Sequence, residues 1–162
     1  MTTGKNILML VSNPATSPVT GWPIGFWWAE LSHAYEVFES AGHAIDIASP
    51  DGGPLQADGY SDPEDESGYS VQDTISLAFK NDPSKMKLLE NTPGLADVDL
   101  AKYDALFVVG GQGPMVTMID NEAVHKFVAD FYETGKTTAA VCHGTCILLK
   151  TRLSNGDLLV KG

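Results

Sequence analysis

The stretch TTAAVCHGTCILL, residues 137–149, constrains the fold of this chain most strongly. Small apolar residues at 139–141 predict a strand that runs directly into Cys142 and His143, and the apolar segment that follows predicts a helix. A thiol at such a turn lies at the carboxyl edge of a sheet, where open α/β sheets bind ligands. Gly144 is expected to leave room for the tight turn and for close approach of a substrate. The stretch predicts a cysteine nucleophile, and a buried, inert Cys142 is the alternative that it leaves open.

Strands and helices alternate along the rest of the chain. Apolar runs predict strands at 5–12, 44–48, 103–109 and 137–141, and apolar periodicity predicts helices at 26–40, 71–81, 83–90 and 122–134. This alternation predicts a doubly wound, mainly parallel α/β sheet with helices on both faces. A polar turn at 154–157 and an apolar segment at 158–160 predict a closing hairpin with a return strand. Because such domains rarely end on a strand, we expect residues 1–162 to form a single domain that lacks its C-terminal elements.

Composition excludes several classes of partner. The net charge of -11 argues against nucleic acid and anionic membranes, because both are bound through basic patches. The apolar run at 7–11 is too short for the core of a signal peptide, and no stretch approaches the length of a membrane span. Cys142 and Cys146 lie four residues apart and do not form a disulfide framework. The sequence therefore predicts a reduced, cytoplasmic protein.

Two further motifs are expected at the same sheet edge. The glycine-rich turn GGQG at 110–113 follows a predicted strand, and its amides are expected to form an oxyanion hole with the amide of His143. Phosphate binding at this turn stays open, although the Walker and dinucleotide patterns are absent. Glu30 lies early in the first helix beside two tryptophans, a setting that raises the pKa of a carboxyl group. When protonated, it would donate a hydrogen bond to the sulfur of Cys142, with His143 as general acid or base.

Metal binding is the less favoured interpretation of these residues. Cys142, His143 and Cys146 could form part of a metal site, but no second cluster of ligands accompanies them. The acidic residues at 62–66 lack the spaced glycine of a calcium loop, and we predict a solvated loop over 49–69. Neither a metal nor a bound cofactor is therefore expected. Cys146 is interpreted as a buried thiol, with a role as a resolving cysteine under oxidation as the alternative.

The motifs AVCHG at 140–144 and GGQGP at 110–114, together with Glu30, resemble the ThiJ/PfpI superfamily. That superfamily shares a flavodoxin-like fold with class I glutamine amidotransferases, and the resemblance covers nearly the whole chain. It implies one class I glutamine amidotransferase-like domain. It also implies that Cys142 is the nucleophile, that Glu30 is hydrogen-bonded to its thiol, and that the amides of Gly111 and His143 flank the oxyanion.

The stretch at 21–53 is most similar to the branch that contains heat-shock chaperone-like, glutathione-independent glyoxalases. The implied reaction converts methylglyoxal to lactate, with addition of the thiolate to the aldehyde and proton transfer by His143. A cysteine peptidase or amidase with the same nucleophile is the first alternative. A stress-response chaperone or redox sensor that uses Cys142 is the second. A His after the cysteine, where amidotransferases carry a small residue, argues against an amidotransferase.

The expected partner is a small aldehyde, enclosed by the loops at 13–25 and 49–70 because no cap domain is evident. The predicted pocket residues are Trp22, Phe26, Trp27 and Gln112. The resemblance further implies a homodimer, because dimers are common among such proteins.

Overall fold

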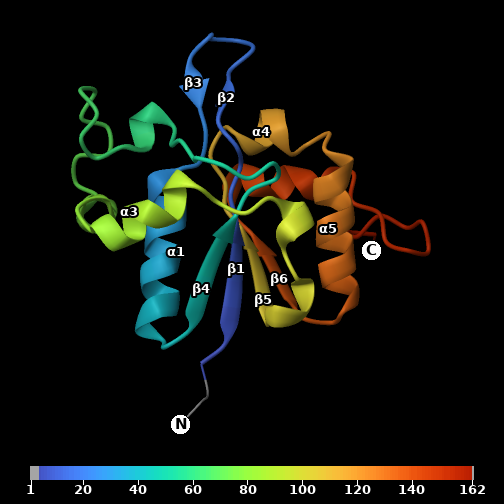
Figure 1. Ribbon diagram of the computed structural model, residues 1–162. Helices are drawn as coiled ribbons and strands as arrows, with labels where there is room; N and C mark the ends of the chain where they lie inside the picture. The colour runs from blue at the N-terminus through green and yellow to red at the C-terminus, as the bar shows by residue number, and fades with distance from the viewer. Residues whose placement is uncertain (1–3, 162) are drawn as a thin grey trace.

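A four-stranded parallel sheet forms the centre of the computed structural model, which describes residues 4–161 (Figure 1). Its strands are β1 (Asn6–Leu10), β4 (Ala44–Ala48), β5 (Ala105–Val108) and β6 (Thr137–Ala140). They lie in the order β4-β1-β5-β6, and each neighbouring pair is parallel. The predicted α/β fold with a parallel sheet is therefore confirmed.

Helices cover both faces of this sheet (Figure 1). The α-helices are α1 (Trp28–Ser40), α2 (Thr74–Lys80), α3 (Pro83–Glu90), α4 (Pro114–Thr117) and α5 (Glu122–Glu133). Short 3₁₀ helices span Gly59–Ser61, Leu95–Asp97 and Leu100–Lys102, and a longer one spans Cys142–Leu149. The carboxylate of Asp73 accepts a hydrogen bond from the Ser76 amide, and this cap explains why α2 begins later than predicted.

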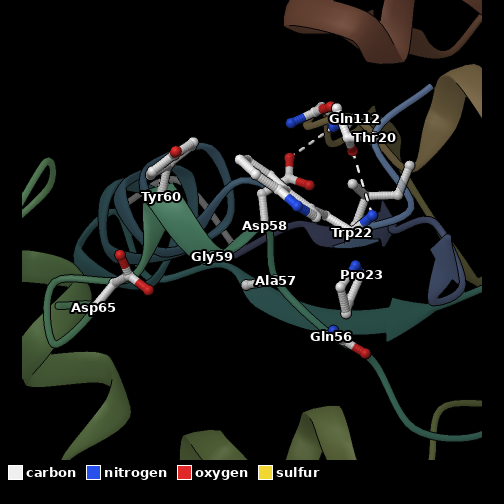
Figure 2. Close-up of a pocket in the computed structure, with 11 residues that line it drawn as sticks. Thr20, Trp22, Pro23, Gln56, Ala57, Asp58, Gly59, Tyr60, Asp65 and Gln112 are labelled. Carbon is white, nitrogen blue, oxygen red and sulfur yellow. Dashed lines mark hydrogen bonds between the residues drawn. The ribbon is translucent and has the colours of Figure 1, made fainter. Parts of the chain in front are cut away.

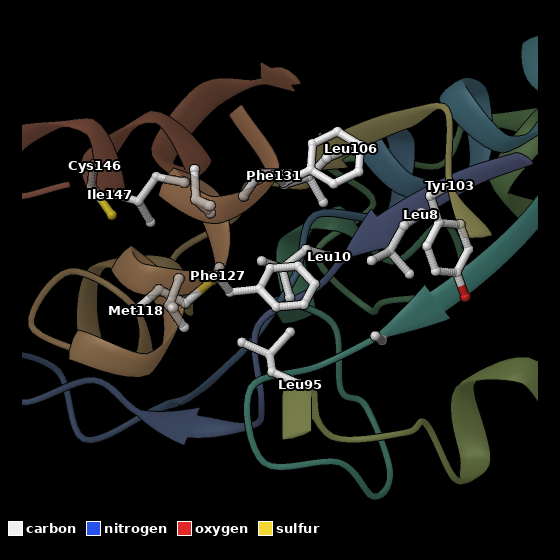
Figure 3. Close-up of a cluster of buried hydrophobic side chains, with 14 residues drawn as sticks. Leu8, Leu10, Leu95, Tyr103, Leu106, Met118, Phe127, Phe131, Cys146 and Ile147 are labelled. Atoms are coloured by element: carbon white, nitrogen blue, oxygen red, sulfur yellow. The ribbon is translucent and has the colours of Figure 1, made fainter. Parts of the chain in front are cut away.

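Two apolar clusters lie on opposite faces of the sheet, and β1 contributes to both. Leu8 and Leu10 belong to the cluster on the α5 face, whereas Met9 belongs to the cluster on the α1 face. Alternate side chains of a strand point to opposite faces, so a strand that is buried on both faces is apolar throughout. Figure 3 shows the cluster on the α5 face, to which α5 contributes Phe127 and Phe131.

Two connections differ from the prediction. The segment at 13–25 contains a short antiparallel hairpin, formed by β2 (Ala15–Thr16) and β3 (Pro23–Ile24), where only a loop was expected. The predicted return strand at 158–160 is wrong, because only an isolated bridge joins Arg152 to Leu158. That segment is hydrogen-bonded back to the residues just before the turn, as in the bond from the Leu159 amide to the Thr151 carbonyl, instead of joining the sheet.

No helix within residues 4–161 combines the length and the apolar composition that crossing a bilayer would require.

Candidate active site

Cys142 lies directly after β6 in a left-handed backbone conformation, with a φ of 50°. Within residues 4–161 it is the only residue other than glycine that has a positive φ. This conformation costs a side-chain-bearing residue about 1–2 kcal/mol, and strain of this kind concentrates at functional sites. The turn leaves Cys142 exposed at the carboxyl end of the sheet. The strand-to-helix elbow is therefore present, although a 3₁₀ helix follows it in place of an α-helix.

Gly144 has a role in packing that differs from the expected one. A Cβ atom at this position would lie 2.9 Å from the carbonyl oxygen of Val108 and 3.0 Å from that of Val109. Real Cβ atoms rarely approach a backbone oxygen so closely. Glycine at this position thus allows the turn after Cys142 to pack onto the end of β5, and the space is not left open for a substrate.

Glu30 projects from the first turn of α1 toward Cys142. A Cβ atom built on Gly110 would lie 2.3 Å from Glu30 Oε2 and 2.7 Å from Cys142 Cβ, so the two side chains converge above this glycine. Burial raises the pKa of Glu30, while the Cys142 thiol, the Gly110 amide and the charge of His143 oppose that rise. Oε2 is buried and has no hydrogen-bond partner among the described residues, and the Cys142 thiol is near enough to act on the pKa of the carboxyl group. Burial is the largest of these effects, so the pKa of Glu30 lies above its ordinary value.

The ring of His143 lies against the glycine-rich turn. Its Nδ1 atom is 3.0 Å from the carbonyl oxygen of Gly111. A carbonyl oxygen can only accept a hydrogen bond, so this contact assigns the hydrogen to Nδ1 and leaves a lone pair on Nε2. Nε2 is thus the ring nitrogen that can take a proton.

The turn at 110–113 is held by the segment that precedes α1. The Gly113 amide donates to the carbonyl of Gly25 at 2.7 Å, and a Cβ atom on Gly111 would lie 2.6 Å from the same carbonyl oxygen. Gly111 also has a φ of 101°, which favours glycine. Within the part of the chain that the structure describes, the amides of Gly111 and His143 donate no hydrogen bond. Both amides are therefore available to a ligand oxygen.

A pocket of about 420 Å³ opens beside the turn, between the β2–β3 hairpin and the loop after β4 (Figure 2). Of the predicted pocket residues, Trp22 and Gln112 line it. Phe26 does not, because the pairing of its backbone with residues 56 and 58 turns its ring into the core, where it is 1% exposed. Trp27 lies outside this pocket and packs edge-on against Tyr69, with the ring centroids 6.2 Å apart.

Asp58 is a buried residue of the site that the sequence analysis missed. It lies in the segment predicted to be a solvated loop, yet it is 1% exposed. Its Oδ1 accepts a hydrogen bond from the Gly25 amide at 3.0 Å. Its Oδ2 accepts one from the Gln112 amide at 2.7 Å, which Figure 2 shows as a dashed line. Burial raises the pKa of Asp58 against the effect of these two bonds and of the His143 charge. The alternation of Leu55 and Ala57 with polar residues was the one signal of a half-buried segment there.

The two cysteines have different environments. Cys146 is buried, its thiol donates to the Pro114 carbonyl at 3.4 Å, and burial raises its pKa to about 11. Cys142 is exposed. Among the described residues, no group of three or more His, Cys, Asp or Glu side chains could hold a metal ion.

Comparison with known proteins identifies the family of this chain. The sequence profile described as the DJ-1/PfpI family matches residues 25–159. This chain belongs to the DJ-1/PfpI family. The family match covers the three regions that meet at the sheet edge, namely the start of α1, the glycine-rich turn and the cysteine elbow.

Several of the curated proteins that this chain is similar to have glyoxalase names. The probable glutathione-independent glyoxalase hsp3104 of Schizosaccharomyces pombe is 32% identical over 97 residues, which cover 59% of this chain and 44% of that protein. Glyoxalase 3 of Candida albicans is 28% identical over 160 residues, which cover 98% of this chain and 66% of that protein. The chain thus spans less than two thirds of the length of these two relatives.

A solved structure shows the same fold over nearly the whole chain. The Rapid Encystment Protein 24 KDa of Francisella tularensis superposes with a TM-score of 0.84 at 27% identity, and the match covers 97% of this chain and 67% of that one.

Proposed function

We propose that this protein is a cysteine-dependent enzyme that acts on reactive carbonyl compounds and converts methylglyoxal to lactate without glutathione. The observation that carries the proposal is the convergence of the exposed Cys142 and the half-buried Glu30, whose Oε2 atom is buried, above Gly110. A protonated carboxyl group beside a thiol stabilises the thiolate by donating a hydrogen bond to it. The glyoxalase names of the relatives support an aldehyde as the substrate.

In the first step, the Cys142 thiol gives up its proton to Nε2 of His143, and the sulfur attacks the aldehyde carbon. A C–S bond forms while the carbonyl π electrons move to the oxygen. The oxygen then takes the thiol proton from Nε2, which gives a hemithioacetal and leaves Nε2 free to act as a base again. The amides of Gly111 and His143, which donate no hydrogen bond within residues 4–161, would stabilise the charge that develops on this oxygen.

In the second step, Nε2 of His143 takes the proton from the former aldehyde carbon and delivers it to the neighbouring carbon through an enediol. The former aldehyde carbon is thereby oxidised and its neighbour reduced, so that no external oxidant is needed. The product is a thioester between lactate and Cys142. Water adds to the thioester, the C–S bond breaks, and lactate leaves with the thiol restored.

The test measures methylglyoxal consumption and lactate formation in buffer without glutathione and without added metal. Cys142→Ala is expected to abolish turnover, and Glu30→Gln is expected to lower kcat by roughly 100-fold, because the amide donates a weaker hydrogen bond to the sulfur. Cys146→Ala is the matched control and should retain turnover, because its thiol faces the Pro114 carbonyl, outside the proposed site. Circular dichroism establishes that each variant is folded.

Three outcomes would contradict the proposal. The first is a folded parent protein that does not consume methylglyoxal. The second is burst release from an activated amide with a trapped acyl-enzyme, which would favour the cysteine peptidase or amidase. The third is reversible oxidation of Cys142 at low peroxide without aldehyde turnover, which would favour the redox sensor.

A reduced, cytoplasmic setting and a homodimer are part of the same proposal. The nucleophile must remain a thiol between turnovers, and reducing compartments maintain thiols. Fractionation with thiol-state labelling tests the compartment, and sedimentation equilibrium tests the dimer.

A further inference from the structure

We propose that Asp58 is a positioning residue that sets the tautomer and orientation of His143 through the peptide group between Gly111 and Gln112. The proposal rests on the proposed function only in assigning His143 the role of base. Its structural part depends on hydrogen bonds that exist whatever the substrate is.

The first step concerns a single peptide group with a partner at each end. Its N–H belongs to Gln112 and donates to Asp58 Oδ2 at 2.7 Å. Its C=O belongs to Gly111 and lies 3.0 Å from Nδ1 of His143. A trans peptide group is planar, and its N–H and C=O point in opposite directions. A carboxylate that fixes the N–H therefore aims the carbonyl oxygen at the imidazole on the other side.

The second step concerns how the Asp58 carboxylate polarises this peptide group. Hydrogen bonds in a chain strengthen one another, so an amide that donates to a carboxylate has a more electron-rich carbonyl oxygen. That oxygen is a better acceptor for the Nδ1–H of His143. The arrangement is equivalent in effect to a carboxylate that holds the catalytic histidine of a triad, with one peptide group inserted between them.

The third step concerns how firmly Asp58 itself is held. The backbone amide of Asp58 donates to the Phe26 carbonyl at 2.7 Å. The backbone carbonyl of Asp58 accepts a hydrogen bond from the hydroxyl of Ser61 at 2.7 Å. Its second carboxylate oxygen accepts from the Gly25 amide. Both oxygens thus accept amide hydrogens, which is the pattern of an ionised carboxylate. A side chain that is 1% exposed and bonded in this way is fixed before any substrate arrives.

Two carboxyl groups act electrostatically on His143, which adjoins Cys142 in the elbow. Glu30 acts from α1, and Asp58 acts from the loop after β4. No hydrogen bond joins Asp58 directly to His143 among the described residues. Asp58 therefore differs from Glu30, because Asp58 reaches the imidazole through the main chain whereas Glu30 contacts the thiol.

The decisive experiment combines nitrogen NMR of the imidazole with kinetics. In the parent protein, neutral His143 should carry its hydrogen on Nδ1. Asp58→Asn leaves one of the two amides without an acceptor and removes the charge, so His143 should shift toward the Nε2–H form. The kcat for methylglyoxal should fall roughly 10- to 100-fold, as it does when a partner that orients a functional histidine is lost, while KM changes little.

Asp51→Asn is the matched control. Asp51 is exposed on the same loop after β4, does not line the pocket, and its carboxylate has no hydrogen bond to the glycine-rich turn among the described residues. The substitution removes the same formal charge, so the His143 spectrum and kcat of this variant should match those of the parent. An Asp58→Asn spectrum that matches the Asp51→Asn spectrum would overturn the proposal.

The NMR measurement separates this proposal from the proposed function. If the parent protein does not turn over methylglyoxal, the tautomer of His143 in the parent and in Asp58→Asn still decides whether Asp58 positions the ring. If Asp58→Asn does not fold, the parent spectrum decides alone. An Nε2–H tautomer in the parent would contradict the proposal, because Nδ1 would then have no hydrogen to donate to Gly111.

Discussion

At the scale of single residues, Gly110 lies directly beneath the contact between Glu30 and Cys142. Gly110→Ala would place a methyl group 2.3 Å from Glu30 Oε2 and 2.7 Å from Cys142 Cβ. We expect this substitution to separate the two side chains, to lower kcat by roughly 100-fold, and to reduce the free energy of unfolding by about 1–3 kcal/mol. Lactate assays and denaturant titrations measure these effects.

Gly59→Ala is the control for this substitution. Gly59 lies on the pocket loop, and its added Cβ atom would meet only Asp65 Oδ2, at an ordinary contact distance of 3.7 Å. Gly59→Ala should leave kcat and the free energy of unfolding close to those of the parent. Equal losses in the two variants would mean that the convergence above Gly110 has no part in the chemistry.

The protonation of Glu30 gives a second prediction, which concerns pH. Because burial raises its pKa above 4.5 in the native state, the native protein binds this proton more tightly than the unfolded chain does. Its contribution to stability is fully present below pH 4.5 and is lost as the pH rises through the raised value. Glu30→Gln removes the buried charge, so its stability relative to the parent should increase from acidic to neutral pH. Denaturant titrations across this range provide the measurement, and a pH-independent difference would contradict the assignment.

At the scale of elements, the junction between β6 and the 3₁₀ helix carries the strain of the site. Cys142 has a φ of 50° and is exposed, so removing its side chain loses little packing. Glycine adopts this conformation freely, whereas alanine does not. We expect Cys142→Gly to be about 1 kcal/mol more stable than Cys142→Ala, although both lack the thiol. Thermal unfolding measures the stability of the two variants. A more stable alanine variant would show that the backbone at residue 142 is not strained.

At the scale of the whole molecule, one sheet joins two apolar clusters. Phe131 is fully buried in the cluster on the α5 face, and Phe79 is 3% exposed in the cluster on the α1 face. Truncating either ring to alanine should cost about 3–5 kcal/mol. Because β1 belongs to both clusters, each variant should still unfold in a single transition.

Calorimetry and circular dichroism test this cooperativity. Tyr132→Ala, at a position 41% exposed beside Phe131, is the control and should change stability by less than the two core substitutions. Two separate transitions in either core variant would indicate that the faces of the sheet unfold independently.

The sheet was predictable from sequence because its strands are buried on both faces. Runs such as residues 7–11 admit few other structures, and the strand at 44–48 was predicted with the observed bounds. The elbow at Cys142 and the approach of Glu30 also follow from motif positions along such a sheet. The burial of Asp58 could not be predicted, because it results from hydrogen bonds to two amides, at Gly25 and Gln112, that are far away in the sequence. The burial of Phe26 likewise depends on long-range backbone pairing.

The main chain and the side chain of Gln112 have separate roles in the glycine-rich turn. The main-chain N–H of Gln112 is bonded to Asp58, whereas its exposed side chain lines the pocket. A mutation at this position replaces the side chain and keeps the N–H, except when proline is introduced. Under the proposed function, substitutions at Gln112 would change the wall of the substrate pocket and leave the hydrogen bond to Asp58 in place. A library randomised at this codon is therefore a natural starting point for altering the range of aldehydes that such an enzyme would accept.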